Sequence, residues 1–227
     1  MPRLPAAVTA IAGGAEARLL WRNELGGLTF RVGDRVVKWN PRSTGIDLAR
    51  ERARLDWLAG RHPAPRVIEY DADEEAQWLV TAALPGSHAI GEPWRDDPAP
   101  AIRAIAAGLR ALHALPAKEL PRAWTEESWV GRMPAALGPR PPLVDPVVVH
   151  GDACAPNTLI SAAGEWTGNV DFGDLAVGDR WADLAVASMS LDWNFGAGHQ
   201  NELFDAYGIA PDPERIRYYR ALWHAES

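Results

Sequence analysis

The sequence predicts an α+β chain, with a β-rich N-terminal lobe that contains one helix and a larger, mostly helical C-terminal lobe. Short β-rich runs separated by glycine turns fill residues 18–40, and helical periodicity dominates the second half of the chain. Between these patterns, Pro85-Gly86 is a strong chain breaker. We therefore expect residues 1–84 to form an N-lobe and residues 85–227 to form a C-lobe, joined by a hinge near residues 82–86.

The composition excludes several classes of protein. Among the 227 residues, 47% are hydrophobic and 23% are charged, which is ordinary for a globular chain, and no apolar run approaches the roughly 20 residues of a membrane helix. The net charge of -7 argues against nucleic acid as a partner and is compatible with a cationic small molecule. A single cysteine, Cys154, excludes an internal disulfide and fits a reducing compartment.

The N-terminus resembles a secretory signal only superficially. Arg3 and the Ala15-Glu16-Ala17 triplet imitate its basic start and its cleavage site, but Pro5 and the Gly13-Gly14 pair interrupt the apolar stretch. We expect a cytoplasmic protein without a membrane anchor.

The elements of the N-lobe follow from turn and capping signals. Residues 18–40 read as one or two hairpins, with Gly33-Asp34 as a two-residue turn. Thr44 with Asp47 resembles a capping box and predicts a helix over residues 47–59. Two further strands are expected at residues 67–70 and 77–82.

The C-lobe shows helical spacing around three short strands. Ile102, Ile105, Leu109 and Leu112 recur at the period of an amphipathic helix. The proline-rich stretch 116–146 predicts at most one short helix near 126–133. Strands are expected at residues 147–149, 158–160 and 166–170, and helices at 180–191, 200–207 and 213–225.

The most specific motif is His150-Gly151-Asp152 with Asn157, followed by Asp171-Phe172-Gly173. Each half follows a strand-like run, and the spacing is that of the catalytic and metal-binding loops of kinases. In such enzymes one aspartate contacts the attacking hydroxyl, while an asparagine and a second aspartate hold Mg²⁺ on the nucleotide. We predict these roles for Asp152, Asn157 and Asp171, and expect the three side chains to meet around one cation.

Each of these residues also has a simpler explanation. Asp152 could cap a turn, Asn157 could form an Asx-turn, and Asp171 could cap the end of a strand. Their joint spacing favours the kinase interpretation. His150 has no metal partner at ligand spacing, so we expect it to bond to the backbone near the Asp171 turn. Cys154 lacks a paired base and is not expected to be a nucleophile.

A charged pair is predicted in the N-lobe. In the helix over 47–59 the apolar stripe includes Leu48 and Leu55, and Glu51 falls on the same stripe. An inward-facing carboxylate requires a cation, and Lys38 at the end of a strand is the candidate; the pair would place the lysine on the α- and β-phosphates. The alternative is that Glu51 reaches solvent. The other charged residues of this helix are expected to point away: Arg50, Arg52, Arg54 and Asp56.

Two weaker signals concern the nucleotide. The turn over residues 23–27 could cover phosphates through backbone amides, or could be a plain hairpin turn, since it lacks the G-x-G-x-x-G spacing. By position alone, Ala82 and Leu84 before Pro85 would offer backbone groups to adenine.

These stretches resemble the aminoglycoside phosphotransferase family, in particular its 3′-phosphotransferase and streptomycin phosphotransferase branch. The D-A-C-x-P-N loop beginning at Asp152, the helix around Glu51 and the segments 179–185 and 207–212 match in order along nearly the whole chain. The resemblance implies a bilobal protein-kinase-like fold and MgATP or MgGTP as donor. It also implies that Asp152 is catalytic, Asn157 and Asp171 bind metal, Lys38 with Glu51 positions the phosphates, and Asp183 is a structural anchor.

Three departures from the family concern the acceptor. Asp174 stands where an arginine is usual, and only Glu226 and the carboxylate of Ser227 could supply the acidic C-terminus that grips substrate amines. The segment between Leu115 and His150 is also short, which implies a smaller or more open acceptor site. The substrate residues we expect are Asp174, Glu226 and Ser227.

Three functions are compatible with the sequence. The first is an ATP-dependent O-phosphotransferase that acts on an aminoglycoside or a similar aminated sugar. The second is a kinase of another small hydroxylated metabolite or antibiotic. The third is a non-catalytic nucleotide-binding module, which the presence of the complete residue set disfavours: Lys38, Glu51, Asp152, Asn157 and Asp171.

Overall fold

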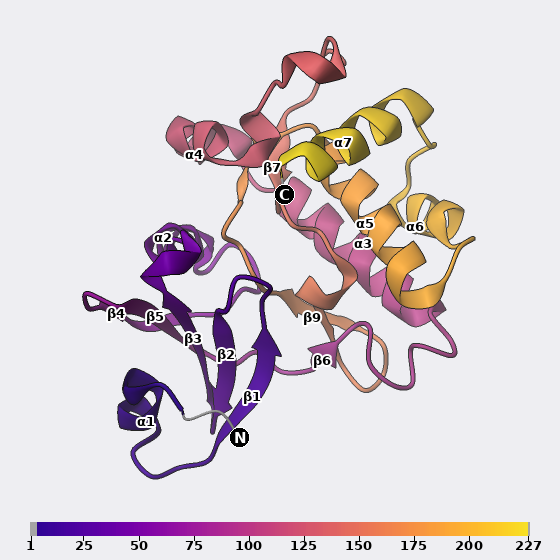
Figure 1. The fold of residues 1–227 in the computed structure, drawn as a ribbon. Helices are drawn as coiled ribbons and strands as arrows, with labels where there is room; N and C mark the ends of the chain where they lie inside the picture. Colours follow the sequence, from indigo (N-terminus) through magenta and orange to yellow (C-terminus); the bar gives the residue numbers. More distant parts are fainter. Residues whose placement is uncertain (1–3, 227) are drawn as a thin grey trace. The chain divides into compact units, whose positions relative to one another are not determined.

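In a computed structural model of the chain, which describes residues 4–226, the chain divides into two compact units (Figure 1). Unit 1 comprises the residues up to Gly60 together with Ala64–Leu84. Unit 2 comprises Arg61–Pro63 and the chain from Pro85 onward. The three residues that follow Gly60 thus belong to unit 2, and the chain then returns to unit 1 before it passes to unit 2 at Pro85.

Unit 1 is built on a five-stranded antiparallel sheet in the order β1-β2-β3-β5-β4. Val32 and Arg35 pair across the turn at Gly33, whose φ of 58° suits a residue without a side chain. The strands are β1 (Ala17–Arg22), β2 (Leu28–Val32), β3 (Arg35–Pro41), β4 (Val67–Ala72) and β5 (Ala76–Ala82).

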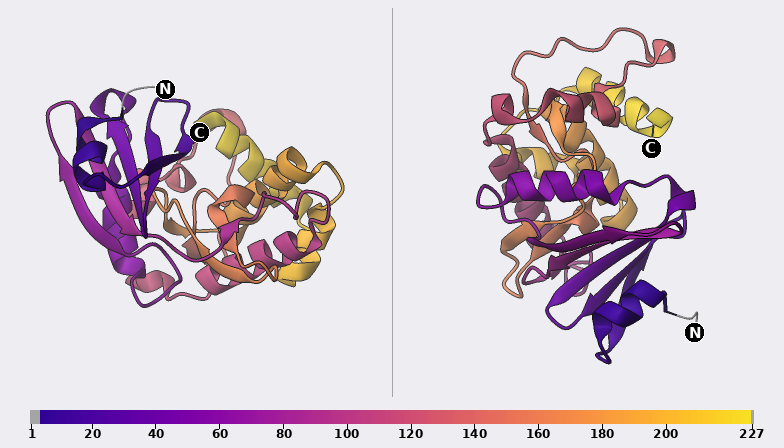
Figure 2. Two further views of the ribbon diagram at one scale, coloured as in Figure 1. Left: turned by 90° about the horizontal axis from the view of Figure 1, so that it is seen from below. Right: turned by 90° about the vertical axis from the view of Figure 1, so that its left-hand side faces the viewer.

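Two helices cover opposite faces of this sheet, as the right-hand view of Figure 2 shows. Helix α1 (Ala6–Ala12) buries Val8 and Ala12 against Val37 and Val80. Helix α2 (Leu48–Leu58) lies on the other face, where Lys38 and its cross-strand neighbour Leu79 also point. The alternation of side chains along β3 and β5 therefore decides which residues α2 meets.

Unit 2 is mostly helical and contains two small sheets. Its helices are α3 (Ala99–His113), α4 (Arg122–Glu127), α5 (Arg180–Phe195), α6 (Gln200–Tyr207) and α7 (Pro213–Glu226). Its strands are β6 (Ser87–His88), β7 (Val147–Val149), β8 (Thr158–Ile160), β9 (Trp166–Asn169) and β10 (Ala176–Gly178). Strand β7 pairs with β10, while β6, β8 and β9 form the other sheet.

The core of unit 2 fixes the positions of the loops between these strands. Helix α3 buries its apolar face, including Ile102, Ile105 and Leu109, against α5 and the strands. All three valines of β7 are buried, so the chain enters the His150 loop from a rigid strand. Burial of this kind stabilises by about 1.5–3 kcal/mol for each large apolar side chain. The loops thus rest on elements that cannot move without opening the core.

The structure confirms the predicted α+β architecture, with a sheet-rich N-terminal part and a helical C-terminal part.

The capping prediction was wrong: the Asp47 side chain accepts the Ala49 amide at 2.9 Å and caps α2, while Thr44 ends a separate 3₁₀ turn. The short helix expected at 126–133 lies earlier, as α4, and a 3₁₀ turn at Trp129–Gly131 follows it. The sequence did not predict α1, β6 or β10.

Over residues 4–226, no helix has both the length and the apolar character that crossing a bilayer requires.

Candidate functional site

Asp152 lies in the loop that follows β7, and its carboxylate is held from one side. Asn157 Nδ2 donates to Asp152 Oδ2 and to the Asp152 carbonyl, both at 2.9 Å. The other carboxylate oxygen, Oδ1, is buried without a hydrogen-bond partner among the described residues. Buried carboxylate oxygens are normally paired, so an unpaired one marks the place where a substrate proton or a ligand would bind.

Asp171 follows β9 and lies near Asp152. Burial raises the pKa of Asp152, and the negative charge of Asp171 raises it further, which shows that the two carboxylates interact. Asp171 has a φ of 70°, and within residues 4–226 it is the one non-glycine residue with positive φ. Backbone strain of this kind concentrates at functional sites. The structure therefore brings the three predicted residues of the His150 and Asp171 loops together.

The two loops approach each other closely at Gly151. A Cβ atom at this position would lie 2.3 Å from the Asp174 carbonyl oxygen, and Gly151 has a φ of 80°. Both facts exclude a larger residue without movement of the backbone. Glycine after the histidine is thus required by the contact between the loops.

A buried carboxylate holds the start of the His150 loop. Asp183, near the start of α5, accepts the His150 amide at 2.7 Å and the Gly151 amide at 3.0 Å. His113 Nε2 lies 2.9 Å from the same carboxylate, and His113 Nδ1 lies 2.8 Å from the Tyr207 hydroxyl. The structure confirms Asp183 as an anchor. Sequence reasoning missed His113, although a histidine at the buried end of an amphipathic helix was a usable signal.

Phe172, which follows Asp171, packs its ring against two histidine rings. The His150 ring lies 4.5 Å from the Phe172 ring, and the His62 ring lies 5.8 Å from it in an edge-on arrangement. His150 Nε2 also lies 3.0 Å from the Val170 carbonyl oxygen, which confirms the predicted backbone contact. Burial lowers the pKa of His62 to about 4, so its ring is neutral at physiological pH.

In unit 1 the predicted charged pair is present. Lys38 Nζ donates to both carboxylate oxygens of Glu51, at 2.6 and 2.8 Å, and Glu51 is only 5% exposed. One expectation for this helix was wrong, because Arg54 is completely buried. Arg54 follows Glu51 by three positions and therefore lies on the same face of α2.

In the two segments that could contact the nucleotide, backbone amides already form hydrogen bonds within the protein. In the turn over residues 23–27, Asn23 Oδ1 accepts the Gly27 amide at 2.6 Å and the Asn23 carbonyl accepts the Gly26 amide. These bonds favour the plain hairpin turn. At the end of β5 the Ala82 amide donates to the Arg66 carbonyl, 2.8 Å away, and the Ala83 amide donates to the Asp34 carbonyl.

The predicted acceptor residues have separate surroundings. The Asp174 carbonyl accepts from Ser128 Oγ at 3.1 Å, which fixes its backbone. Glu226 Oε2 lies 4.0 Å from Arg132 Nε near the end of α7. Ser227 lies outside the described residues.

Cys154 is half-buried beside Asp152. Burial raises the pKa of its thiol well above the usual range, and the Asp152 charge adds to this effect. A thiol that stays protonated is a poor nucleophile.

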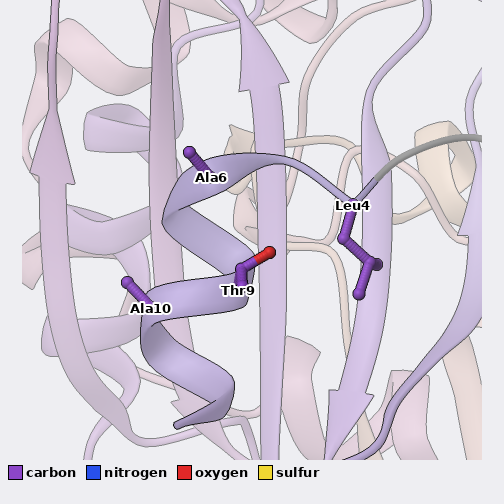
Figure 3. Close-up of a pocket in the computed structure, with 4 residues that line it drawn as sticks. All are labelled: Leu4, Ala6, Thr9 and Ala10. Atoms are coloured by element: carbon purple, nitrogen blue, oxygen red, sulfur yellow. The ribbon is translucent and has the colours of Figure 1, made fainter. Parts of the chain in front are cut away.

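Two hollows lie away from these loops, and few of the residues that line them are charged. One lies beside α1 and is lined by Leu4, Ala6, Thr9 and Ala10, with no ionisable side chain (Figure 3). Another is lined by eight residues of unit 2, of which only Glu92 is charged. Neither hollow contains the residues of the His150 and Asp171 loops.

The donor set at these loops fits a magnesium ion that is bound mainly through a nucleotide. The Asn157 amide nitrogen donates both of its hydrogen bonds to Asp152, which leaves Asn157 Oδ1 as the atom that can bind a cation. Asp171 adds a carboxylate. Within residues 4–226 no group of three or more His, Cys, Asp or Glu side chains could hold a metal by itself. Phosphate and water oxygens would complete the shell, as is usual for Mg²⁺.

A buried Lys–Glu pair on a five-stranded sheet, together with an Asp–Asn–Asp set on a helical unit, defines a phosphotransferase of the kinase type. A family model described as "Phosphotransferase enzyme family" matches residues 7–138 and 131–219. The chain is 33% identical to an aminoglycoside 3′-phosphotransferase of Streptomyces fradiae, over 80% of this chain and 81% of that protein. It is 31% identical to a streptomycin 3″-kinase of Streptomyces griseus, over 96% of each chain.

Solved structures agree with this result. An aminoglycoside 3′-phosphotransferase of type VIII has a TM-score of 0.72 at 29% identity, covering 95% of this chain and 96% of its own. Aminoglycoside phosphotransferase APH(3″)-Id of Streptomyces rimosus has a TM-score of 0.73 at 26% identity, covering 95% and 94%. The chain belongs to the aminoglycoside phosphotransferase family. The resemblance and the fold class predicted from the sequence are confirmed.

Proposed function

We propose that this protein transfers the γ-phosphate of ATP to a hydroxyl group of an aminoglycoside or a similar aminated sugar. The observation that carries the proposal is the arrangement at Asp152, whose carboxylate is oriented by Asn157, flanked by Asp171 and left with one unpaired oxygen. The relatives named above act on aminoglycosides, and one of them is a streptomycin kinase. These names support the choice of acceptor.

Asp152 is the catalytic residue in this proposal. Its free Oδ1 would accept a hydrogen bond from the acceptor hydroxyl and orient the oxygen for in-line attack on the γ-phosphate. The oxygen–phosphorus bond to the acceptor forms as the bond to the β-phosphate oxygen breaks, and the hydroxyl proton leaves through Asp152. Asn157 keeps the carboxylate in position throughout.

Unit 1 would contribute a charged pair and backbone groups to nucleotide binding. In unit 1, Lys38 would contact the α- and β-phosphates, with Glu51 holding its ammonium group in place. Since the Ala82 and Ala83 amides are engaged, the Leu84 amide and the Ala82 carbonyl are the backbone groups we assign to adenine. GTP would bind in the same way with altered contacts to its base. The N-lobe function assigned to residues 1–84 rests on these contacts.

Magnesium would be held by Asn157 Oδ1 and the Asp171 carboxylate. When bound, such an ion neutralises charge on the transferred phosphoryl group. The C-lobe comprises residues 85–227. Its candidates for contacts with a cationic acceptor are Asp174, Glu226 and Ser227. Because the donor is ATP, we place the protein in the cytoplasm.

A direct assay tests this function. Purified protein would be incubated with MgATP and a panel of aminoglycosides, with streptomycin included, and a second panel of hydroxylated amines without sugar rings. Transfer adds about 80 Da to the acceptor, the mass of one phosphoryl group. If only compounds of the second panel gain a phosphoryl group, the acceptor is a hydroxylated amine and not an aminoglycoside. If no compound of either panel gains one although the protein binds ATP, the proposal is overturned.

A further inference from the structure

Two consecutive residues outside the predicted motifs hold both loops of the site. Ser128 Oγ donates to the Asp174 carbonyl at 3.1 Å, and Trp129 Nε1 donates to the Gly151 carbonyl at 2.5 Å. Ser128 is fully buried and Trp129 is 6% exposed. One short segment therefore binds the loop that carries Asp152 and the loop that follows Asp171.

The bond from Trp129 acts on the peptide group next to Asp152. The carbonyl of the Gly151–Asp152 peptide accepts the indole N–H, while the N–H of the same peptide points to His150 Nδ1 at 3.2 Å. A peptide group held at both ends cannot rotate about its neighbouring dihedral angles without losing a buried hydrogen bond. The direction of the Asp152 side chain depends on those angles.

The segment that provides these bonds is itself rigid. Ser128 Oγ also accepts the Val130 amide and caps the 3₁₀ turn Trp129–Gly131. Val130 is 1% exposed and packs closely on Gly178, where a Cβ would lie 2.5 Å from Val130 Cγ1. The Trp129 ring meets the Trp223 ring of α7 edge-on, with 5.3 Å between centroids. Helix α4, which precedes this turn, and α7 are labelled in Figure 1.

We propose that Ser128 and Trp129 form a clamp that positions Asp152 relative to the Asp171 loop. We call this pair the 128–129 clamp. The inference rests on the proposed function, because positioning matters only if Asp152 contacts the acceptor. Neither residue touches the reacting atoms in this assignment, so both are positioning residues. The clamp lies in the segment between α3 and β7, whose role in this proposal is to order the catalytic loop.

Trp129→Phe removes the indole donor and keeps an aromatic ring against Trp223. The matched control is Trp181→Phe in α5. Trp181 is 5% exposed, meets the Phe204 ring edge-on with 5.5 Å between centroids, and has no indole hydrogen bond among the described residues. We expect Trp129→Phe to lower kcat by about tenfold to a hundredfold, with KM for ATP within about threefold of wild type. The control should keep kcat within about threefold.

Hydrogen exchange of the full-length protein gives a second measurement that does not depend on activity. Trp129→Phe should speed amide exchange in peptides covering residues 150–157, and Ser128→Ala should speed it over residues 171–175. Trp181→Phe should leave both regions unchanged.

The outcomes separate the two proposals. If wild type phosphorylates an aminoglycoside and Trp129→Phe matches Trp181→Phe in kcat and in exchange, the clamp is refuted while the function stands. If both tryptophan variants lose kcat equally, the loss reflects general core packing and also refutes the clamp. If wild type transfers phosphate to no acceptor, the proposed function fails, and unchanged exchange in Trp129→Phe would then refute the clamp separately.

Discussion

Lys38 and Glu51 form a two-point ion pair, with Nζ 2.6 and 2.8 Å from the two carboxylate oxygens and Glu51 almost completely buried. A buried ion pair is weak as a source of stability, because the desolvation of both charges offsets their attraction. The presence of this pair between β3 and α2 is better explained by a need to hold the lysine ammonium in one place.

Lys38→Met should lower kcat/KM for ATP by about a hundredfold or more, since the phosphates lose a positioned cation. Glu51→Gln should cause a smaller fall, about tenfold, because the lysine remains but is no longer fixed by charge. Steady-state kinetics with varied ATP measures both effects. Arg52→Met is the control: Arg52 forms an exposed pair with Asp56 on the same helix and should leave kcat/KM within about twofold. An unchanged value for Lys38→Met would remove Lys38 from the nucleotide site.

Asp171 offers a test that separates backbone strain from metal binding. Asn tolerates a φ of 70° almost as well as Asp, whereas Ala does not and should cost about 1 kcal/mol in the free energy of unfolding. Both Asp171→Asn and Asp171→Ala should raise the Mg²⁺ concentration needed for half-maximal turnover, because both lose the carboxylate. Urea unfolding and a magnesium titration measure the two effects. A magnesium requirement unchanged in Asp171→Asn would exclude Asp171 as a metal ligand.

Asp183 should matter for stability more than any surface carboxylate. Asp183→Ala leaves the buried amides of His150 and Gly151 without an acceptor and should lower the free energy of unfolding by about 3–5 kcal/mol. Asp145, which pairs with Arg180 at the surface and is 74% exposed at its side chain, is the control; Asp145→Ala should cost less than about 1 kcal/mol. Equal losses in the two variants would contradict the anchoring role.

The lowered pKa of His62 implies that folding stability depends on pH. Its pKa in the folded protein is about 4, against 6.5 for the free side chain, because burial disfavours the charged ring and the neighbouring His150 and His113 add to this effect. Above pH 6.5 the ring is neutral in both states. As the pH falls from about 6.5 to about 4, the unfolded chain gains a proton that the folded protein does not, so folding stability is lost over this range.

Wild type should therefore lose about 2 kcal/mol more than His62→Gln between pH 7 and pH 5, measured by urea unfolding. His62→Gln keeps a polar group that can bond to Asn169, which His62 Nε2 meets at 3.2 Å. Parallel losses in the two proteins would show that His62 is not the residue responsible.

Much of this site could be predicted because local patterns encode it. The spacing of His150, Asp152 and Asn157 places three groups in one loop after a buried strand, and the helical period alone turns Glu51 inward toward Lys38. Both predictions depend on residues close together in sequence or on a single repeating period.

The residues that were missed act over long distances in sequence. His113 reaches Asp183 across 70 positions, and Trp129 reaches the Gly151 carbonyl from a proline-rich stretch with no readable period. The burial of Arg54 was missed for a related reason, since an arginine on an amphipathic helix is usually solvated. Thr44 does not cap α2, because Asp47 lies next to the first helical residue and the Asp47 carboxylate accepts the Ala49 amide.

The central claim is that Asp152 carries phosphoryl transfer from ATP to an aminoglycoside hydroxyl. The most direct measurement is the mass of streptomycin and of other aminoglycosides after incubation with MgATP and either wild type or Asp152→Asn, with ATP affinity measured in parallel. We predict a gain of about 80 Da with wild type, a rate lower by about a thousandfold or more with Asp152→Asn, and equal affinity for ATP. Transfer by Asp152→Asn at the wild-type rate would contradict the assignment of Asp152, and the absence of transfer by wild type would contradict the function itself.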